Sequence, residues 1–193
     1  VVCQEYKNWN LFIIDNASKD NSKKILNKFE NISHNIKVIY LPKNKGVGFS
    51  RNLGMRLSKA EYISFIDSDD YWSANKLKDQ INFMQKFNHF FTYTDYTPFI
   101  SKNNIKVFKN NVITPNSFTY DQFINNTSIA TSTMIIKRNS IGNVKFSNTR
   151  ICEDYFFKCQ ILKKTNYAYC LSENLTKYRI RNNSLQSSKI RNL

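Results

Sequence analysis

The sequence predicts an α/β fold, in which helices flank a mostly parallel open sheet and a mixed α+β half follows. Three observations carry this prediction. Short apolar runs alternate with helical patterns through the first half of the chain. The first and third of these runs lead directly into aspartates, Asp15 and Asp67. From about residue 90 onward, aromatic-rich strands replace the regular alternation.

The alternation of the first half separates three expected strands by two helices. Each strand is a short apolar run between polar residues, and each helix carries apolar residues on one face. Ser18 or Asp20 can cap the first helix, and Pro42 ends the second strand. Connections this short are typical of an open parallel sheet, which binds ligands at the carboxyl ends of its strands. The expected strands span residues 11–15, 36–41 and 62–66, and the helices run from the cap to residue 31 and over residues 49–59.

We expect one domain over residues 1–193, because this length fits a single hydrophobic core. No linker divides the chain, which holds only three prolines and four glycines. Its two halves, residues 1–97 and 98–193, should therefore share that core. Further helices are expected over residues 74–87 and 153–164, and further strands over residues 90–96, 131–137, 167–171 and 175–180.

The composition indicates a folded, cytoplasmic protein without a transmembrane helix. Hydrophobic residues make up 41% of the chain and aromatic residues 15%, which is too much apolar material for a disordered segment. The purely apolar runs are far shorter than the roughly 20 residues that cross a bilayer. No secretion signal opens the chain. Its four cysteines lack the spacing of a zinc site and are expected to be free thiols.

Basic residues exceed acidic ones, with 29 Lys and Arg against 14 Asp and Glu and a formal net charge of +15. Such an excess favours polyanionic partners: nucleic acid, anionic lipid headgroups or phosphate-bearing substrates. Charge alone does not choose among them, so the choice depends on the motifs.

Three carboxylates crowd the end of the third expected strand, in residues 67–70 (Asp-Ser-Asp-Asp). Clustered hard oxygen ligands suit Mg²⁺ or Mn²⁺ bridging a diphosphate, and such a metal would neutralise their mutual repulsion. Taken alone, a run of this kind is more often a helix cap or an acidic turn. The other motifs of the chain favour a metal site over a cap or an acidic turn.

The acidic run is one of five pieces of sequence spread over nearly the whole chain. They are residues 15–18 (DNAS), residues 44–46 (NKG) with 51–54 (RNLG), residues 65–70 (FIDSDD), residues 152–155 (CEDY) and residues 178–184 (YRIRNNS). No single piece is specific, but five in this order are hard to produce by chance. Their order and spacing resemble those of family 2 glycosyltransferases, enzymes of the Rossmann-like GT-A fold.

For the donor, the resemblance implies that Asp15 and Asn16 lie beside the nucleotide base and that Arg51 approaches the base or the diphosphate. Asp70 would bind the metal, Mn²⁺ or Mg²⁺, and Asp69 would hydrogen-bond the ribose or assist the metal. Many relatives have Asp-Asp where this chain has Asp15 and Asn16, which leaves the base open. Each of these residues also has a plain structural explanation. Asp15 and Asn16 could cap the end of a strand, and Arg51 could be an exposed arginine on a helix.

For the chemistry, the resemblance assigns the catalytic base to Asp154, whose carboxylate would take the proton of the acceptor hydroxyl as the sugar configuration inverts. Glu153 is expected to contact the acceptor or a phosphate. By themselves, both residues could simply complement the positive end of a helix. Arg179 and Arg181 would neutralise the leaving diphosphate. Trp72 would line the sugar or acceptor site, with core packing an equal alternative.

We therefore expect an inverting hexosyl- or N-acetylhexosaminyl-transferase that uses a nucleotide-sugar donor, most simply a UDP-sugar. The acceptor would be a surface glycan such as lipopolysaccharide, lipooligosaccharide or capsule, either as a glycan or as a lipid-linked acceptor. The enzyme would touch anionic membrane at the cytoplasmic face of the inner membrane and bind no nucleic acid. Two alternatives stay open: a nucleotidyltransferase of similar α/β fold, and a basic nucleic-acid-binding module that would stack aromatic side chains on bases.

One departure from the family concerns the ends of the chain. Family members begin with an apolar strand in the middle of the sheet, and this chain starts after it, at residues 1–6 (VVCQEY). We expect that strand to be missing here, together with its part of the nucleotide site. Relatives also commonly continue past the C-terminal segment into basic amphipathic helices, which we expect to be absent.

Overall fold

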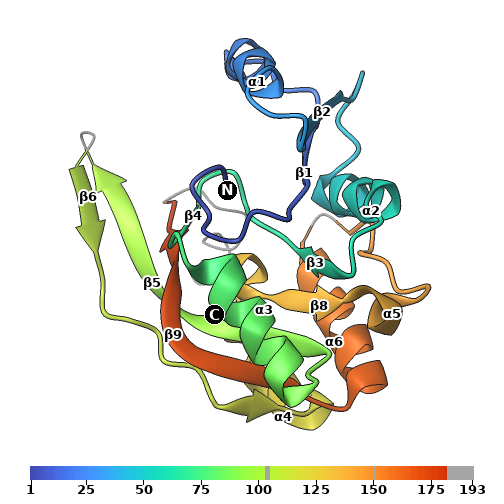
Figure 1. Cartoon of the computed structure of the whole chain (residues 1–193), viewed down its shortest axis with the longest axis vertical. Coiled ribbons are helices and arrows are strands. Elements are labelled where there is room, and N and C mark those ends of the chain that lie inside the picture. The colour runs from blue at the N-terminus through green and yellow to red at the C-terminus, as the bar shows by residue number, and fades with distance from the viewer. Residues whose placement is uncertain (103–104, 150, 182–193) are drawn as a thin grey trace.

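A computed structural model describes residues 1–102, 105–149 and 151–181 of the chain (Figure 1). Its strands form a two-stranded sheet and a seven-stranded sheet. The small sheet consists of β1 (Leu11–Asp15) and β2 (Ile36–Tyr40). The large sheet has the order β3-β8-β5-β9-β4, with β6 paired to β5 and β7 to β9. Its strands are β3 (Tyr62–Ser64), β4 (Tyr71–Trp72), β5 (Phe91–Lys102), β6 (Ile105–Phe108), β7 (Ser117–Phe118), β8 (Ile135–Lys137) and β9 (Ala168–Arg179).

Among the described helices, the four longer ones agree with the predicted ranges to within a few residues, whereas the short helices over residues 120–125 and 138–141 were not predicted. The first two belong to the small sheet, where α1 contacts β2 and α2 contacts β1. The helices are α1 (Ser22–Glu30), α2 (Val47–Leu57), α3 (Lys76–Phe87), α4 (Tyr120–Asn125), α5 (Arg138–Ile141) and α6 (Glu153–Thr165), and a short 3₁₀ turn, η1, spans Thr131–Thr133.

The large sheet has helices on both faces, as two adjacent residues of β8 demonstrate. Ile135 belongs to a buried cluster with Leu77 and Met84 of α3. Ile136 belongs to the main core cluster, which includes Phe157 of α6. Because successive side chains of a strand point to opposite faces, α3 and α6 must cover opposite sides of the sheet. Figure 1 shows α3 in front of the sheet and α6 behind it.

The α/β class and the open sheet flanked by helices are confirmed, but the strand directions differ from the expectation of a mostly parallel sheet. Among the described residues, parallel pairing occurs between β1 and β2 and between β5 and β9, whereas the other named strand pairs are antiparallel. The strand–helix alternation that predicts parallel pairing stops at β3. Beyond it, most neighbouring strands pair antiparallel, as β6 does with β5, the strand before it in the chain.

Three of the strands expected in the second half have different boundaries in the structure. Residues 131–137 divide into the turn η1 and the short strand β8. The hydroxyl groups of η1 bond to carboxylates and carbonyls outside a strand ladder, which competes with strand formation. The strands expected over residues 167–171 and 175–180 form one strand, β9, whose register against β5 shifts beside Asp95.

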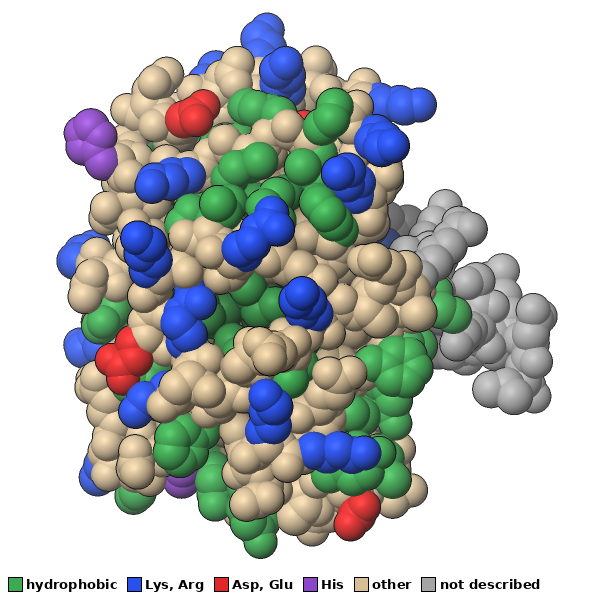
Figure 2. Space-filling model, turned by 90° about the vertical axis from the view of Figure 1, so that its right-hand side faces the viewer, with side chains coloured by type: hydrophobic (Ala, Val, Ile, Leu, Met, Phe, Trp, Pro, Cys, Tyr) green, Lys and Arg blue, Asp and Glu red, His purple; other side chains and the backbone are tan. Residues whose placement is uncertain are grey.

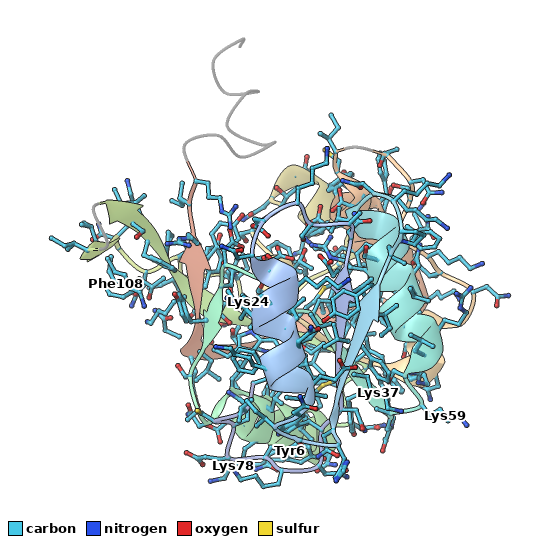
Figure 3. The ribbon with its side chains drawn as sticks, turned by 90° about the horizontal axis from the view of Figure 1, so that it is seen from above. Tyr6, Lys24, Lys37, Lys59, Lys78 and Phe108 are labelled. Atoms are coloured by element: carbon cyan, nitrogen blue, oxygen red, sulfur yellow. The ribbon has the colours of Figure 1, made fainter. Side chains whose placement is uncertain are left out.

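Within the described ranges, no helix combines the length and apolar character needed to cross a membrane. The four cysteines are free, as expected, with Cys3 and Cys152 exposed and Cys159 and Cys170 buried. Lysines lie around the periphery of the molecule, including Lys24, Lys37 and Lys59 (Figure 3).

Candidate active site

The candidate site joins side chains from four segments that are distant in sequence. Arg51 of α2 bonds to Asp67, which follows β3, and to Glu153, the first residue of α6. Asp70, from the same acidic turn, accepts a hydrogen bond from the backbone of Arg179 in β9. The structure therefore gathers the acidic run, the Glu-Asp pair and the end of β9 in one place.

Asp70 is the most deeply placed carboxylate of the acidic turn, with 7% of its surface exposed. Its Oδ2 accepts from Ser132 Oγ at 2.6 Å, and its Oδ1 accepts from the backbone N–H of Arg179 at 2.8 Å. Burial raises the pKa of Asp70 to about 6, while these two hydrogen bonds oppose the rise. The negative charges of Asp67 and Asp69 add to it. A nearby cation would therefore stabilise the ionised form.

A divalent cation fits the donor set of this turn. Asp70 and Asp69 offer carboxylate oxygens, and Mg²⁺ usually takes one or two carboxylates together with substrate phosphates. Within the described part of the chain, no three His, Cys, Asp or Glu side chains converge to hold a metal by themselves. Phosphate oxygens of a bound donor would have to complete the coordination. The acidic turn therefore suits a metal ion that binds together with the phosphates of the donor.

Arg51 bridges two carboxylates. Its Nη2 lies 2.7 Å from Asp67 Oδ1, and its Nη1 lies 2.7 Å from Glu153 Oε1. The side chains of Arg51 and Glu153 are each only 11% exposed. Burial would lower the pKa of Arg51, but the two carboxylates outweigh it and raise that pKa, so the guanidinium stays charged. Donor contact by Arg51 stays a prediction, and the bridge is a role that the sequence did not indicate.

Asp154, the expected base, lies beside a second cation. Its Oδ2 accepts from Lys158 Nζ at 2.8 Å and from Thr131 Oγ1 at 2.8 Å. Burial acts to raise the pKa of Asp154, but Lys158, Thr131 and the more distant charge of Arg51 outweigh it and hold that pKa well below its usual range. The carboxylate is therefore ionised at any physiological pH, as a base must be before it accepts a proton.

The turn η1 connects the two acidic groups. Ser132 Oγ donates to Asp70 and accepts from the backbone N–H of Asp67 at 3.0 Å, while its neighbour Thr131 donates to Asp154. Neither hydroxyl was predicted as a site residue, because residues 131–137 were expected to form a strand. A run of three small hydroxyl residues and the i, i+4 spacing of Asp154 and Lys158 were the signals available.

Asp15 is the last residue of β1, and Asn16 follows it in the loop that contacts the motif at residues 44–46. Asp15 is buried, and its Oδ1 accepts from the backbone N–H of Ser18 at 3.2 Å. Asn16 donates through Nδ2 to Asn44 Oδ1 at 2.8 Å and accepts at Oδ1 from the backbone N–H of Lys45 at 2.8 Å. The motif at residues 15–18 and the motif at residues 44–46, which are separated in the sequence, therefore contact each other in the structure. Contact of Asp15 and Asn16 with a base stays a prediction.

The other predicted contacts occupy the edges of the site. Trp72 donates from Nε1 to the backbone carbonyl of Ser132 at 2.7 Å, which ties it to the turn η1. Arg181 Nε lies 2.6 Å from Asp69 Oδ2, with 59% of the arginine side chain exposed. The guanidinium of Arg179 lies over the ring of Phe99. Residues 182–184 of the late motif lie outside the described residues.

The chain matches known proteins along nearly its whole length. The family model described as Glycosyl transferase family 2 matches residues 1–145. The chain is 34% identical to a putative teichuronic acid biosynthesis glycosyltransferase, TuaG of Bacillus subtilis, over 98% of this chain and 74% of that protein. It is 33% identical to the UDP-Glc:alpha-D-GlcNAc-diphosphoundecaprenol beta-1,3-glucosyltransferase WfgD of Escherichia coli, over 100% of this chain and 74% of that protein.

Solved structures share the fold. S. aureus TarS 1-349 in complex with UDP-GlcNAc superposes with a TM-score of 0.78 at 22% identity, covering 96% of this chain and 54% of that chain. The mannosyltransferase PcManGT from Pyrobaculum calidifontis, in complex with GDP-Man and Mn²⁺, superposes with a TM-score of 0.71 at 12% identity, covering 98% and 54%. The chain thus spans about half the length of these structures. On the family match and the identity to these relatives, the chain belongs to family 2 of the glycosyltransferases.

Proposed function

We propose that this chain catalyses inverting transfer of a hexose or N-acetylhexosamine from a UDP-sugar to a lipid-linked surface-glycan acceptor. One observation carries the proposal: the buried Asp70 and the ionised Asp154 bond to adjacent residues of one turn, η1. A metal-binding carboxylate and a base are thereby held at a fixed separation. The names of WfgD and TuaG, a UDP-glucose enzyme with a diphosphoundecaprenol acceptor and a teichuronic acid enzyme, support the substrate classes.

In this proposal, residues 1–97 bind the donor and residues 98–193 carry the base. Asp15 and Asn16 present hydrogen-bonding groups to the base of the nucleotide. Asp70 and Asp69 hold Mn²⁺ or Mg²⁺, which neutralises the charge of the leaving diphosphate. Arg179 and Arg181 extend positive charge along the same edge, and Asp154 takes the proton of the acceptor hydroxyl.

Calorimetry with UDP tests the donor site. We expect UDP to bind in the presence of Mn²⁺ and to bind at least about tenfold more weakly in excess chelator. The physical reason is that two carboxylates repel a diphosphate unless a cation stands between them. GDP under the same conditions is the control for base recognition.

Two results would count against this assignment. Equal UDP affinity with and without metal would exclude Asp70 and Asp69 as metal ligands. Absence of UDP binding, combined with tight and salt-sensitive binding of random oligonucleotides, would favour the nucleic-acid-binding module instead.

We also propose that the enzyme contacts anionic membrane at the cytoplasmic face through the hairpin of β5 and β6. Ile105 and Phe108 are 66% and 54% exposed, and Lys106 and Lys109 beside them are exposed. No Asp or Glu occurs between residues 96 and 120. Phe108 lies at the outer edge of the molecule (Figure 3). Apolar side chains interleaved with lysines are typical of a surface that binds anionic lipid.

The hairpin also lies close to the acidic turn, since Lys106 Nζ is 4.1 Å from the ring centre of Tyr71, the residue after Asp70. A lipid-linked acceptor could therefore reach the site while the hairpin stays on the membrane. Lysines and arginines on another face of the molecule also lie among apolar side chains, with few acidic groups (Figure 2). Membrane contact by the whole protein is therefore compatible with its net charge of +15.

Vesicle sedimentation tests this surface. Replacing Lys106 and Lys109 by glutamine should weaken binding to phosphatidylcholine–phosphatidylglycerol vesicles about 30-fold, because each lysine near an anionic surface contributes about 1 kcal/mol. Phe108→Ser should also weaken it, whereas Ile25→Ser, an exposed residue of α1, serves as the matched control. Equal losses for the hairpin variants and the control would refute the surface.

A further inference from the structure

Both hydrogen bonds to the carboxylate of Asp154 end on the same oxygen. Thr131 Oγ1 and Lys158 Nζ each lie 2.8 Å from Oδ2. In the described part of the chain, no side chain or backbone group donates to Oδ1. The two oxygens of this carboxylate therefore differ: Oδ2 accepts two hydrogen bonds, and Oδ1 accepts none from the described residues.

The occupied oxygen is held firmly. Lys158 is 3% exposed, so water does not compete for its ammonium group. The same ammonium donates to the backbone carbonyl of Ile129 at 2.7 Å, which ties α6 to the segment that leads into η1. Rotation of the Asp154 carboxylate would break two bonds inside a buried network. A carboxylate fixed in this way presents one defined oxygen to the acceptor.

On the basis of the proposed function, we propose that Oδ1 of Asp154 is the atom that receives the acceptor proton, and that Lys158 and Thr131 are positioning residues that present it. The acceptor O–H bond breaks as the proton moves to Oδ1, and the oxygen forms a bond to the anomeric carbon. The bond from that carbon to the diphosphate breaks, and its electron pair leaves with UDP. Asp154 is then a neutral acid and returns the proton to solvent.

The turn η1 also fixes the orientation of a carboxylate on the donor side. Ser132, which follows Thr131, donates to Asp70 Oδ2 and accepts from the backbone of Asp67. The orientation of the base and the orientation of the metal carboxylate are therefore set by neighbouring residues of one turn. Misplacement of a reacting group by about 1 Å can cost about 100-fold in rate.

Three charged or titratable groups face Asp154 from the elements packed around it. Lys158 belongs to its own helix, Arg51 comes from α2, and Tyr178 comes from β9. Lys158 is the nearest cation and lowers the pKa of Asp154 by its charge and its hydrogen bond. Removing that cation should raise the pKa, so that protonation of the base stops catalysis at a higher pH than in the wild type.

The test compares variants of the turn and the helix in the complete chain. Lys158→Met should lower kcat about 100-fold with little change in donor KM, and the acid limb of the kcat profile at saturating donor and metal should move to a higher pH than in the wild type. Thr131→Val should lower kcat about tenfold, and Thr131→Ser, which keeps the hydroxyl, should restore it. Thr133→Val is the matched control, because the Thr133 hydroxyl donates to the nearby Ala130 carbonyl and to neither acidic group among the described residues.

The outcomes separate this inference from the proposed function. If the wild type transfers sugar and Lys158→Met keeps the wild-type kcat and pH profile, the inference is overturned. Equal losses for Thr131→Val and Thr133→Val would reduce Thr131 to a structural role and also overturn it. Should Lys158→Met not fold, the comparison of Thr131→Val with Thr131→Ser decides alone. A wild type that neither binds UDP nor transfers sugar would count against the proposed function instead.

Discussion

Replacing Asp154 by asparagine should lower kcat by about 100- to 10,000-fold, the usual contribution of a general base. An amide has the size of the carboxylate, and its oxygen can still accept from Lys158 and Thr131, but it cannot take a proton at the pH of the reaction. UDP binding should stay close to that of the wild type, because Asp154 does not belong to the donor side. Product mass from a donor and a lipid-linked acceptor measures the loss.

The matched control for this change is Asp121→Asn, which alters an exposed aspartate in the first turn of α4. It should leave kcat and UDP binding unchanged. Transfer by Asp154→Asn at the wild-type rate would remove Asp154 from the role of base, whatever its surroundings suggest.

Replacing Asp70 by asparagine should remove the metal dependence of UDP binding. In the presence of Mn²⁺, the affinity of the variant should fall at least about tenfold, to the level that the wild type has in chelator. The reason is that a neutral amide lacks the charge that attracts a divalent cation, whose preferred ligands are ionised carboxylates. Transfer should fall with binding, because the leaving diphosphate would keep its charge. Calorimetry over a series of Mn²⁺ concentrations provides the measurement.

Asp20→Asn is the corresponding control, since Asp20 is exposed and its carboxylate accepts a hydrogen bond from the nearby backbone N–H of Ser22. Its UDP affinity should keep the full response to Mn²⁺. The melting temperature of Asp70→Asn without metal shows whether the fold is kept. A folded variant that still responds to Mn²⁺ like the wild type would move the metal site away from Asp70.

The family and the general fold were predictable from short patterns. Aspartates at strand ends, a Gly-bearing loop and a late Glu-Asp pair are local features, and their order along the chain resembles one family. The family match and the relatives confirm that assignment. The direction of most strands was not predictable in this way, because pairing partners such as β3 and β8 are chosen by packing of the whole sheet.

The individual roles in the site were harder to predict. Arg51 was expected at the donor, and its observed partner Glu153 lies 102 positions away in the sequence. Ser132 and Thr131 were read as strand residues, although they hold the two acidic groups. Nothing in a periodic pattern says which distant side chain a hydroxyl or guanidinium will meet, so these contacts follow only from the packed structure.

Membership of family 2 was predictable from the amino-acid sequence, because its acidic residues keep a family-like order and spacing relative to the predicted strands and helices. That Asp70 and Asp154 bond to adjacent residues of one turn, and that Oδ2 of Asp154 accepts two hydrogen bonds, became evident only from the packed structure. Hydrogen bonds and burial depend on distances between segments far apart in the chain, and only folding brings those segments together.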